Sequence, residues 1–282
     1  MSAPSSETLA PAHDGRFATE LAGGRLFAVG GRIALDGTAS WAPAAATGYQ
    51  SANAYLLLGE EALIVDPGLP CVAAAVMAGL KQAVPATVTP RVFLTRSQFD
   101  CIGNLHAVMT AHGVEDIFTG GLDNPFDSFD SATSLEAGGP AASRRVVERS
   151  PEESRLEIYS TPLRLLATFW GYDAETRTLF SSDSFTHVTV ADLETVPVIR
   201  SGAEDPTTVE QVRAHLFATF WWLPYADKRA IASELRGFFA SHPVEVLAPC
   251  RGGALVGADV VARHVELLLA VLDEAPRETL WR

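Results

Sequence analysis

A short polar loop, Arg96-Ser97-Gln98-Phe99-Asp100-Cys101, lies between an apolar run and a helix-like segment. The preceding run, Val92 to Thr95, has the composition of a buried strand. Loops at the carboxyl end of a strand often carry functional side chains, because ordered backbone there makes the side chains converge. The loop combines a guanidinium, an amide, a carboxylate and a thiol. These groups could form ion pairs or, through the carboxylate and the thiol, contribute to a metal site.

The composition indicates a soluble globular protein with an acidic surface. The chain has 282 residues, of which 48% are hydrophobic, and a formal net charge of −13. This charge argues against nucleic acid and against an anionic membrane surface as partners. No stretch is apolar enough to predict a membrane span. Three cysteines, Cys71, Cys101 and Cys250, cannot all pair within one chain. This odd number favours free thiols and a cytoplasmic location.

The order of apolar runs and turn signals predicts strands and helices in alternating blocks. Residues 1–15 are small and polar with two prolines, which predicts a loose arm before a single domain over 16–282. Strands are expected at 25–29, 32–35, 54–58, 62–65, 91–95, 154–161, 163–173, 176–185 and 244–249. Helices are expected at 71–83, from 102 to about 112, at 207–223, 226–242 and 258–275. Residues 119–150 are rich in Gly, Asp and Ser, and we expect a long surface excursion there.

The start and end of the helix near residue 207 have specific signals. Glu210 follows Thr207 by three residues, a capping-box pattern, and Pro224 is expected to stop the helix. Strand-rich blocks separated by helices predict sheets whose outer faces are covered by helices.

Four segments of the chain resemble the metallo-β-lactamase fold superfamily. "NAYLLLGEEALIVDPG" is similar to the opening hairpin, and "VFLTRSQFDCIGNL" to the metal-binding loop that usually reads Thr-His-x-His-x-Asp-His-x-Gly-Gly. "IYSTPLRLLATFWGYDAETRTLFSSDSF" and "VEVLAPCRGG" resemble the two later metal-binding segments. The sequences "LFSSDSFTH" and "WWLPYADK" are most similar to the flavodiiron and oxygen-binding diiron branch. The resemblance covers nearly the whole chain and implies a four-layer αββα sandwich, an α/β fold.

The resemblance places other residues at the family's metal-binding positions. The positions that would be histidines are Arg96, Gln98, Cys101, Arg164 and Arg251, and the two family aspartates are kept as Asp100 and Asp183. Arginine is always protonated and has no lone pair for a metal ion. A guanidinium instead matches a carboxylate in a two-point ion pair. We therefore expect Arg96, Arg164, Arg251, Asp100 and Asp183 to form one cluster with a formal charge of +1 in place of two metals, and no cofactor.

Several readings of this cluster remain open. It could be an ion-pair network that only fills the former cavity, or its surplus positive charge could bind a small anion. Cys101 and Cys250 could instead join Asp100 and Asp183 in holding one zinc or iron ion. A misalignment of Arg164, whose neighbours match the family poorly, is a further alternative.

Aromatic residues and one histidine could line a cleft beside the cluster. His187 follows Asp183 by four residues and could face the cleft, although an ordinary loop histidine is the simpler interpretation. Trp221 and Trp222 are adjacent on the expected helix, so at least one should point to a cleft or to a partner.

The leading functional hypothesis is a non-catalytic structural or regulatory subunit of a hetero-oligomeric hydrolase whose active subunit has the same fold. The alternatives are an active hydrolase with a rebuilt site, acting on an ester, lactone or aryl ether, and a module that binds a small anionic or aromatic ligand.

Overall fold

The computed structural model describes residues 18–59, 61–114, 116–119, 132–134, 145–147 and 156–275. The expected N-terminal arm at 1–15 lies outside the described residues, as does most of the expected excursion at 119–150. No helix in the described ranges combines the length and the apolar character that crossing a membrane requires.

The first sheet has seven strands in sequence order, β1 to β7. Its first four strands are antiparallel neighbours, whereas β4, β5, β6 and β7 run parallel to one another. The hairpin of β3 and β4 was expected from its two apolar runs. The strands are β1 (Ala18–Ala22), β2 (Leu26–Ala34), β3 (Tyr49–Leu58), β4 (Ala62–Val65), β5 (Arg91–Leu94), β6 (Ile117–Thr119) and β7 (Ala132–Ser134).

The second sheet also has seven strands, in the order β12-β14-β13-β11-β10-β9-β8. β11 and β13 run parallel, although 63 residues separate their bounds, and β9, β10 and β11 form an antiparallel meander. The strands are β8 (Arg145–Val147), β9 (Leu156–Ser160), β10 (Phe169–Asp173), β11 (Thr178–Ser182), β12 (Val198–Ile199), β13 (Val246–Pro249) and β14 (Ala254–Val256).

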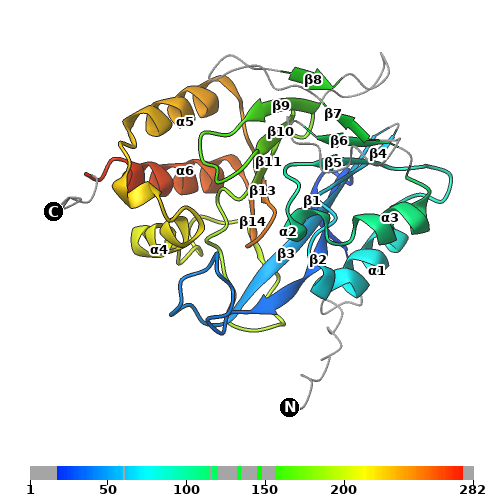
Figure 1. Cartoon of the computed structure of the whole chain (residues 1–282), viewed down its shortest axis with the longest axis horizontal. Coiled ribbons are helices and arrows are strands. Elements are labelled where there is room, and N and C mark those ends of the chain that lie inside the picture. The colour runs from blue at the N-terminus through cyan, green and yellow to red at the C-terminus, as the bar shows by residue number, and fades with distance from the viewer. Residues whose placement is uncertain are drawn as a thin grey trace.

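Helices cover the outer faces of the two sheets, so the fold has the expected four layers (Figure 1). The helices α1, α2 and α3 lie on the side of the first sheet, and α4, α5 and α6 on the side of the second. Their bounds are α1 (Ala73–Ala83), α2 (Phe99–Ile102), α3 (Leu105–His112), α4 (Val209–Thr219), α5 (Arg229–Ser241) and α6 (Ala258–Leu272), with short 3-10 turns at Pro70–Val72 and Leu223–Tyr225.

Three apolar clusters correspond to the three contacts between layers. The middle cluster joins the two sheets, with Tyr55, Val65 and Phe93 from the first sheet against Phe180 and Val246 from the second. The other two clusters pack each sheet against its own helices. Both faces of each sheet are therefore buried, which explains why the central strands read as continuous apolar runs rather than as alternating patterns.

Some expected elements differ from the structure. The two strands expected at 25–29 and 32–35 form one continuous strand, β2, because every residue from Leu26 to Ala34 pairs with β3, Gly30 and Gly31 included. The helix expected to reach Pro224 ends at Thr219, and its cap is Thr208, whose hydroxyl accepts a hydrogen bond from the Gln211 amide, rather than Thr207. The expectation of an irregular stretch at 119–150 missed the short strands β7 and β8.

Candidate functional site

The carboxyl ends of four strands meet at one end of the sandwich. Asp66 follows β4 and Arg96 lies two residues beyond β5 in the first sheet, while Asp183 follows β11 and Arg251 lies two residues beyond β13 in the second. Within each sheet the two strands are parallel neighbours, so their carboxyl ends lie side by side. The fold thus gathers side chains that are up to 185 residues apart in sequence (251 minus 66).

Two arginines and two aspartates form a closed ring of ion pairs, which we call the ion-pair cluster: Arg96, Asp100, Asp183 and Arg251. Arg96 pairs with both aspartates. Arg251 also pairs with both, and its Nη2 donates to Asp183 Oδ1 at 2.6 Å. All four side chains are at most 8% exposed. Such buried charges are tolerable because each carboxylate has two guanidinium partners.

Trp41 covers one side of Arg251. Its ring centroid lies 4.7 Å from the guanidinium carbon of Arg251, a cation–π distance. The indole nitrogen of Trp41 donates to Gln50, and the Gln50 amide donates to the carbonyl of Thr186 at 2.7 Å. Nε of Arg251 is buried without a hydrogen-bond partner among the described residues. The arginine is therefore positioned by its two carboxylates and by the Trp41 ring.

Asp66 forms a second buried acidic position next to the cluster. Its two carboxylate oxygens accept hydrogen bonds from the backbone amide of Thr95 at 2.9 Å and from the Thr95 hydroxyl at 2.6 Å. Burial raises the pKa of Asp66 to about 6, although Thr95 and Arg96 oppose this shift. Asp66 has a positive φ of 49°, a conformation that aspartate adopts more readily than most residues.

Cys101 and Cys250 lie together beside the cluster. With Asp100 they form the one set of three candidate metal ligands found among the described residues, with ligand atoms within 4.8 Å of one another. The Sγ atom of Cys250 lies 3.7 Å from Asp183 Oδ1, and Nε of Arg96 lies 3.4 Å from the Sγ atom of Cys101. Burial raises the pKa of the Cys250 thiol well above its ordinary value, and the adjacent Cys101 adds to the shift.

Two of the expected site residues lie outside the cluster. Arg164 is exposed on the loop between β9 and β10, and no ion pair joins it to Asp100 or Asp183 in the described structure. The expectation of a five-residue cluster was therefore wrong. Gln98 is partly exposed and is the N-cap residue of α2. The formal charge of the cluster is thus two positive minus two negative, or zero, rather than +1.

His187 faces the protein interior. It is 3% exposed and lines a water-sized cavity of about 10 Å³ together with Asp183 and His215. Its Nε2 lies 2.8 Å from Nδ1 of His264, and the two rings stack. Burial lowers the pKa of His187 well below its ordinary value, and His264 lowers it further. His187 is therefore held neutral.

The two tryptophans after α4 point in different directions, as expected, but they do not lie on the helix. Trp221 is 69% exposed, whereas Trp222 packs against the core beside the second sheet. The Thr219 hydroxyl donates to the carbonyl of Trp41, so the end of α4 lies against the Trp41 loop near the cluster. Neither tryptophan lines the cavity that contains Asp183.

Sequence reasoning missed the roles of Trp41 and Asp66. Asp66 could have been found from the sequence, because it directly follows an apolar strand and precedes Pro67-Gly68. A charged residue at such a position contributes nothing to an apolar core. Trp41 lies in an irregular segment between β2 and β3, and no local pattern connects it with Arg251.

Comparisons with known proteins give structural matches only. No family model matches the chain, and no curated protein matches it in sequence. Rubredoxin oxygen:oxidoreductase from Desulfovibrio gigas superposes with a TM-score of 0.67 and 18% identity, over 92% of this chain and 62% of that one. Residues 1–254 of a diflavin flavoprotein from Nostoc superpose with a TM-score of 0.63 and 15% identity, over 91% and 98%. A flavoprotein from Thermotoga maritima gives a TM-score of 0.60 and 18% identity, over 88% and 58%.

This chain therefore spans about three fifths of the length of two of these proteins. Identities of 18% or less establish the arrangement of the backbone and leave the chemistry to be argued from the side chains. The two seven-stranded sheets, their helical outer layers and these superpositions together show that the chain has the metallo-β-lactamase-like fold of the flavodiiron core.

Proposed function

We propose that this chain is a non-catalytic structural or regulatory subunit of a hetero-oligomeric hydrolase whose active subunit has the same fold. The observation that carries the proposal is the ion-pair cluster. Both aspartates that the fold family would use for metal binding are already paired with Arg96 and Arg251.

The residues present do not fit a dinuclear metal centre. Two guanidinium groups next to the aspartates would repel two divalent cations at short range, and they supply no lone pair. The cluster is also neutral as it stands, so no counter-ion is needed to balance Asp100 and Asp183. The same neutrality removes the surplus positive charge on which small-anion binding depended.

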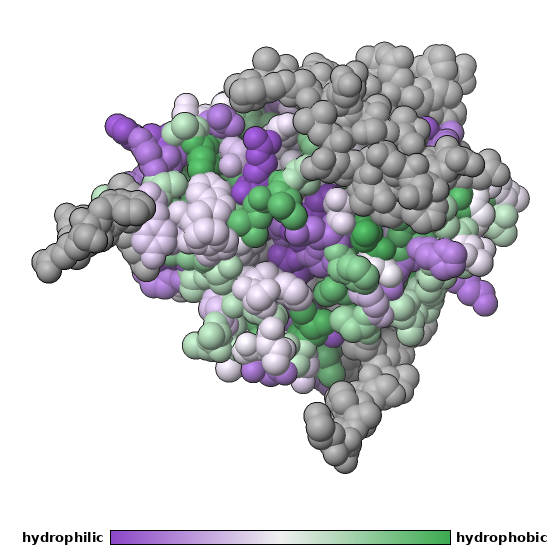
Figure 2. Space-filling view, in the orientation of Figure 1, coloured by the Kyte–Doolittle hydropathy of each residue, from purple (hydrophilic) through white to green (hydrophobic). Residues whose placement is uncertain are grey.

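Exposed apolar residues at the same end of the molecule support a protein partner. Phe99 is 73% exposed at the start of α2, and Leu165 and Leu166 are exposed on the loop before β10. That loop lies beside the cluster, because the amide of Phe169 donates to the carbonyl of Thr95 at 2.8 Å. Figure 2 shows a hydrophilic area near the centre of this face with hydrophobic residues beside it. Large exposed apolar side chains that lie close together often mark a surface that contacts another protein.

The direct test is elemental analysis of the native, untagged protein. Hydrolase assays of the chain alone and of the chain together with any protein that co-purifies with it follow. We expect zinc, iron and manganese far below one equivalent in this chain. We also expect hydrolysis only in a complex with a metal-containing subunit of the same fold. Stoichiometric metal in the purified chain, or turnover by the chain alone, would contradict the proposal.

A substitution in the complex separates a supporting role from a catalytic one. Arg96→Met removes one guanidinium from the cluster without adding a metal ligand of the family's type. We expect a lower melting temperature for the complex and an unchanged kcat per assembled complex. A collapse of kcat at equal assembly would place this chain in the chemistry.

A second candidate function is that of an active hydrolase whose metal ion is held by Asp100, Cys101 and Cys250. If both thiols lose their protons, one divalent ion balances the two new negative charges, and the site stays neutral. The raised pKa of Cys250 makes this ionisation costly, so only a metal with high affinity for thiolates could drive it.

Titration with Co(II) tests this rebuilt metal site. A thiolate-to-cobalt absorption band that is lost in Cys250→Ser, together with turnover lost in the same variant, would favour an active hydrolase. The absence of such a band up to millimolar Co(II) would eliminate this candidate and leave the first proposal intact.

A further inference from the structure

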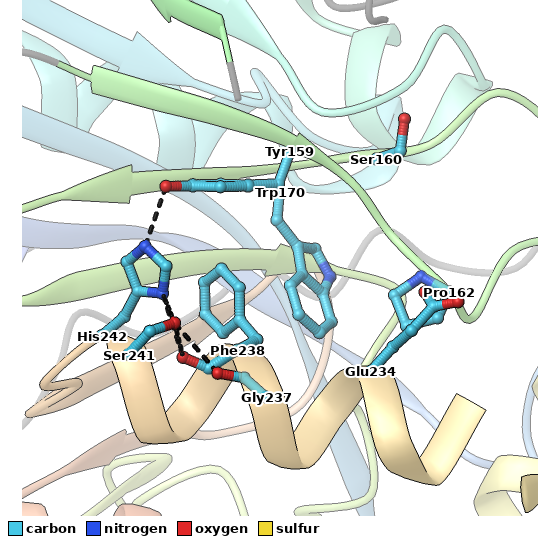
Figure 3. A pocket seen from close by; sticks show the side chains of 9 residues that line it. All are labelled: Tyr159, Ser160, Pro162, Trp170, Glu234, Gly237, Phe238, Ser241 and His242. Carbon is cyan, nitrogen blue, oxygen red and sulfur yellow. Dashed lines mark hydrogen bonds between the residues drawn. The ribbon is translucent and has the colours of Figure 1, made fainter. Parts of the chain in front are cut away.

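A pocket of about 360 Å³ lies on the outer side of the second sheet, and no residue of the ion-pair cluster lines it (Figure 3). Its walls come from β9, the loop after it, the start of β10 and one face of α5. Pockets of this size are large enough to enclose most of a small organic molecule. The lining residues are Tyr159, Ser160, Pro162, Trp170, Glu234, Gly237, Phe238, Ser241 and His242.

Four of the nine lining residues of the pocket have aromatic rings. In Figure 3 the indole of Trp170 lies between Phe238 on one side and Pro162 on the other. Phe238 makes edge contacts with Tyr159 and Trp170, with both pairs of ring centroids 5.2 Å apart. The Phe238 ring also stacks on His242 at 4.3 Å. These mutual contacts fix the rings before any ligand arrives, which lowers the entropic cost of binding.

The hydrogen-bonding groups at the back of the pocket are already satisfied. Nε2 of His242 lies 2.8 Å from the Tyr159 hydroxyl, which in turn contacts Glu157. Nδ1 of His242 lies 2.9 Å from the carbonyl of Phe238, and the Trp170 indole donates to the carbonyl of Ser181. A ligand is therefore met here by ring surfaces rather than by free donors.

Glu234 supplies a negative charge at the edge of the pocket. It has no ion pair among the described residues, and none of the lining residues is Lys or Arg. The chain as a whole carries a net charge of −13. Ring faces attract cations, and a nearby carboxylate adds to that attraction, so the pocket disfavours an anion and favours a cation.

Gly237 lies on the wall of the pocket. It lies inside α5, where glycine costs about 0.5–1 kcal/mol of stability relative to alanine. A Cβ atom built on Gly237 meets no atom within 4 Å, so close packing does not require glycine here. The open space in front of this position is the pocket itself.

We propose that this pocket binds a small organic cation, a quaternary ammonium or protonated amine attached to an apolar or aromatic group. The apolar part lies against Tyr159, Pro162 and Phe238, with the buried Trp170 behind them, and the cationic group lies near Glu234. Binding of such a cation in this pocket depends neither on the ion-pair cluster nor on a partner subunit.

Calorimetric titration and thermal shift with three matched probes test the proposal on the full chain at low ionic strength. The probes are benzyltrimethylammonium, benzyl alcohol and benzoate, which share a phenyl group and differ in charge. We expect the cation to bind at millimolar concentration or better and to raise the melting temperature, with the alcohol weaker and benzoate weakest. Equal binding of benzoate, or no binding of the cation at millimolar concentration, would overturn the proposal.

Two substitutions locate the binding. Glu234→Gln should weaken binding of the cation about two- to fivefold and leave binding of benzyl alcohol unchanged. The matched control Glu266→Gln, at an exposed position on α6, should change neither. Gly237→Leu should abolish binding of all three probes by filling the pocket, whereas Gly237→Ala should retain it. If Gly237→Leu does not fold, the comparison of the two glutamate variants still decides, and equal effects of both would sink the proposal.

Discussion

Arg251 Nη2 donates to Asp183 Oδ1 at 2.6 Å, and each of the two side chains is 2% exposed. The two residues are 68 positions apart and follow adjacent parallel strands, β13 and β11. This ion pair therefore depends on correct pairing in the second sheet. Because Arg251 also holds Asp100, it links the two halves of the sandwich.

Removing Arg251 should destabilise the protein strongly. Arg251→Leu leaves Asp100 and Asp183 with Arg96 as their one remaining guanidinium, and breaking a buried ion pair in this way costs about 3–5 kcal/mol. Urea denaturation should show this loss as a lower midpoint with a similar slope. Arg251→Lys keeps the positive charge and should lose clearly less stability. Equal stability of wild type and Arg251→Leu would mean that the cluster is not formed in solution.

Asp66 should make the protein less stable as the pH rises. Its pKa is about 6 in the folded state against an ordinary value near 4, so between these values the folded state holds more protons. Stability therefore falls as the pH rises from about 4 to 6, by about 3 kcal/mol for this group. Asp66→Asn should remove this contribution. The measurement is the difference between the two unfolding free energies across pH 4 to 7, since other carboxylates change alike in both proteins.

A difference that stays constant between pH 4 and 7 would contradict the raised pKa of Asp66. Asparagine also tolerates the positive φ at this position, so backbone strain should not obscure the comparison.

The three thiols should react at very different rates. Cys71 is exposed, whereas Cys101 and Cys250 are buried, and burial raises the pKa of Cys250 well above its ordinary value. Ellman's reagent should therefore modify one thiol rapidly in the native protein and three in denaturant. Cys71→Ser should abolish the rapid phase. Two or more rapid thiols in the native protein would mean that the region beside the cluster opens readily.

The N-cap of α4 should contribute measurably to stability. The hydroxyl of Thr208 accepts a hydrogen bond from the amide of Gln211 at 3.2 Å. Thr208→Ala should cost about 1 kcal/mol in thermal or chemical unfolding. Thr208→Ser keeps the oxygen and should restore most of the loss. An alanine variant as stable as wild type would show that another group satisfies this amide.

Local patterns predicted most of the fold. The hairpin of β3 and β4, the strand β5 and the amphipathic helix α6 follow from apolar runs and turn residues that act within a few positions of one another. Strands β6, β7, β8, β12 and β14 were missed because each has at most three residues and is stabilised by its neighbours in the sheet rather than by its own composition. The five-residue strand β1 was also missed, because Ala18–Ala22 is not a continuous apolar run.

The candidate site was predictable in its residue types and only partly in its membership. The chain's sequence by itself determined that the loops after β5 and β13 carry guanidinium, carboxylate and thiol groups and no histidine, and residue identity decides which atoms are available to pair or to bind a metal. The tertiary structure alone decided that Arg96 and Arg251 reach both aspartates, that Arg164 does not, and that Trp41 covers Arg251. The physical reason is that these contacts join strand ends and loops from both sheets, and such distances depend on how the sheets pack and not on any local pattern.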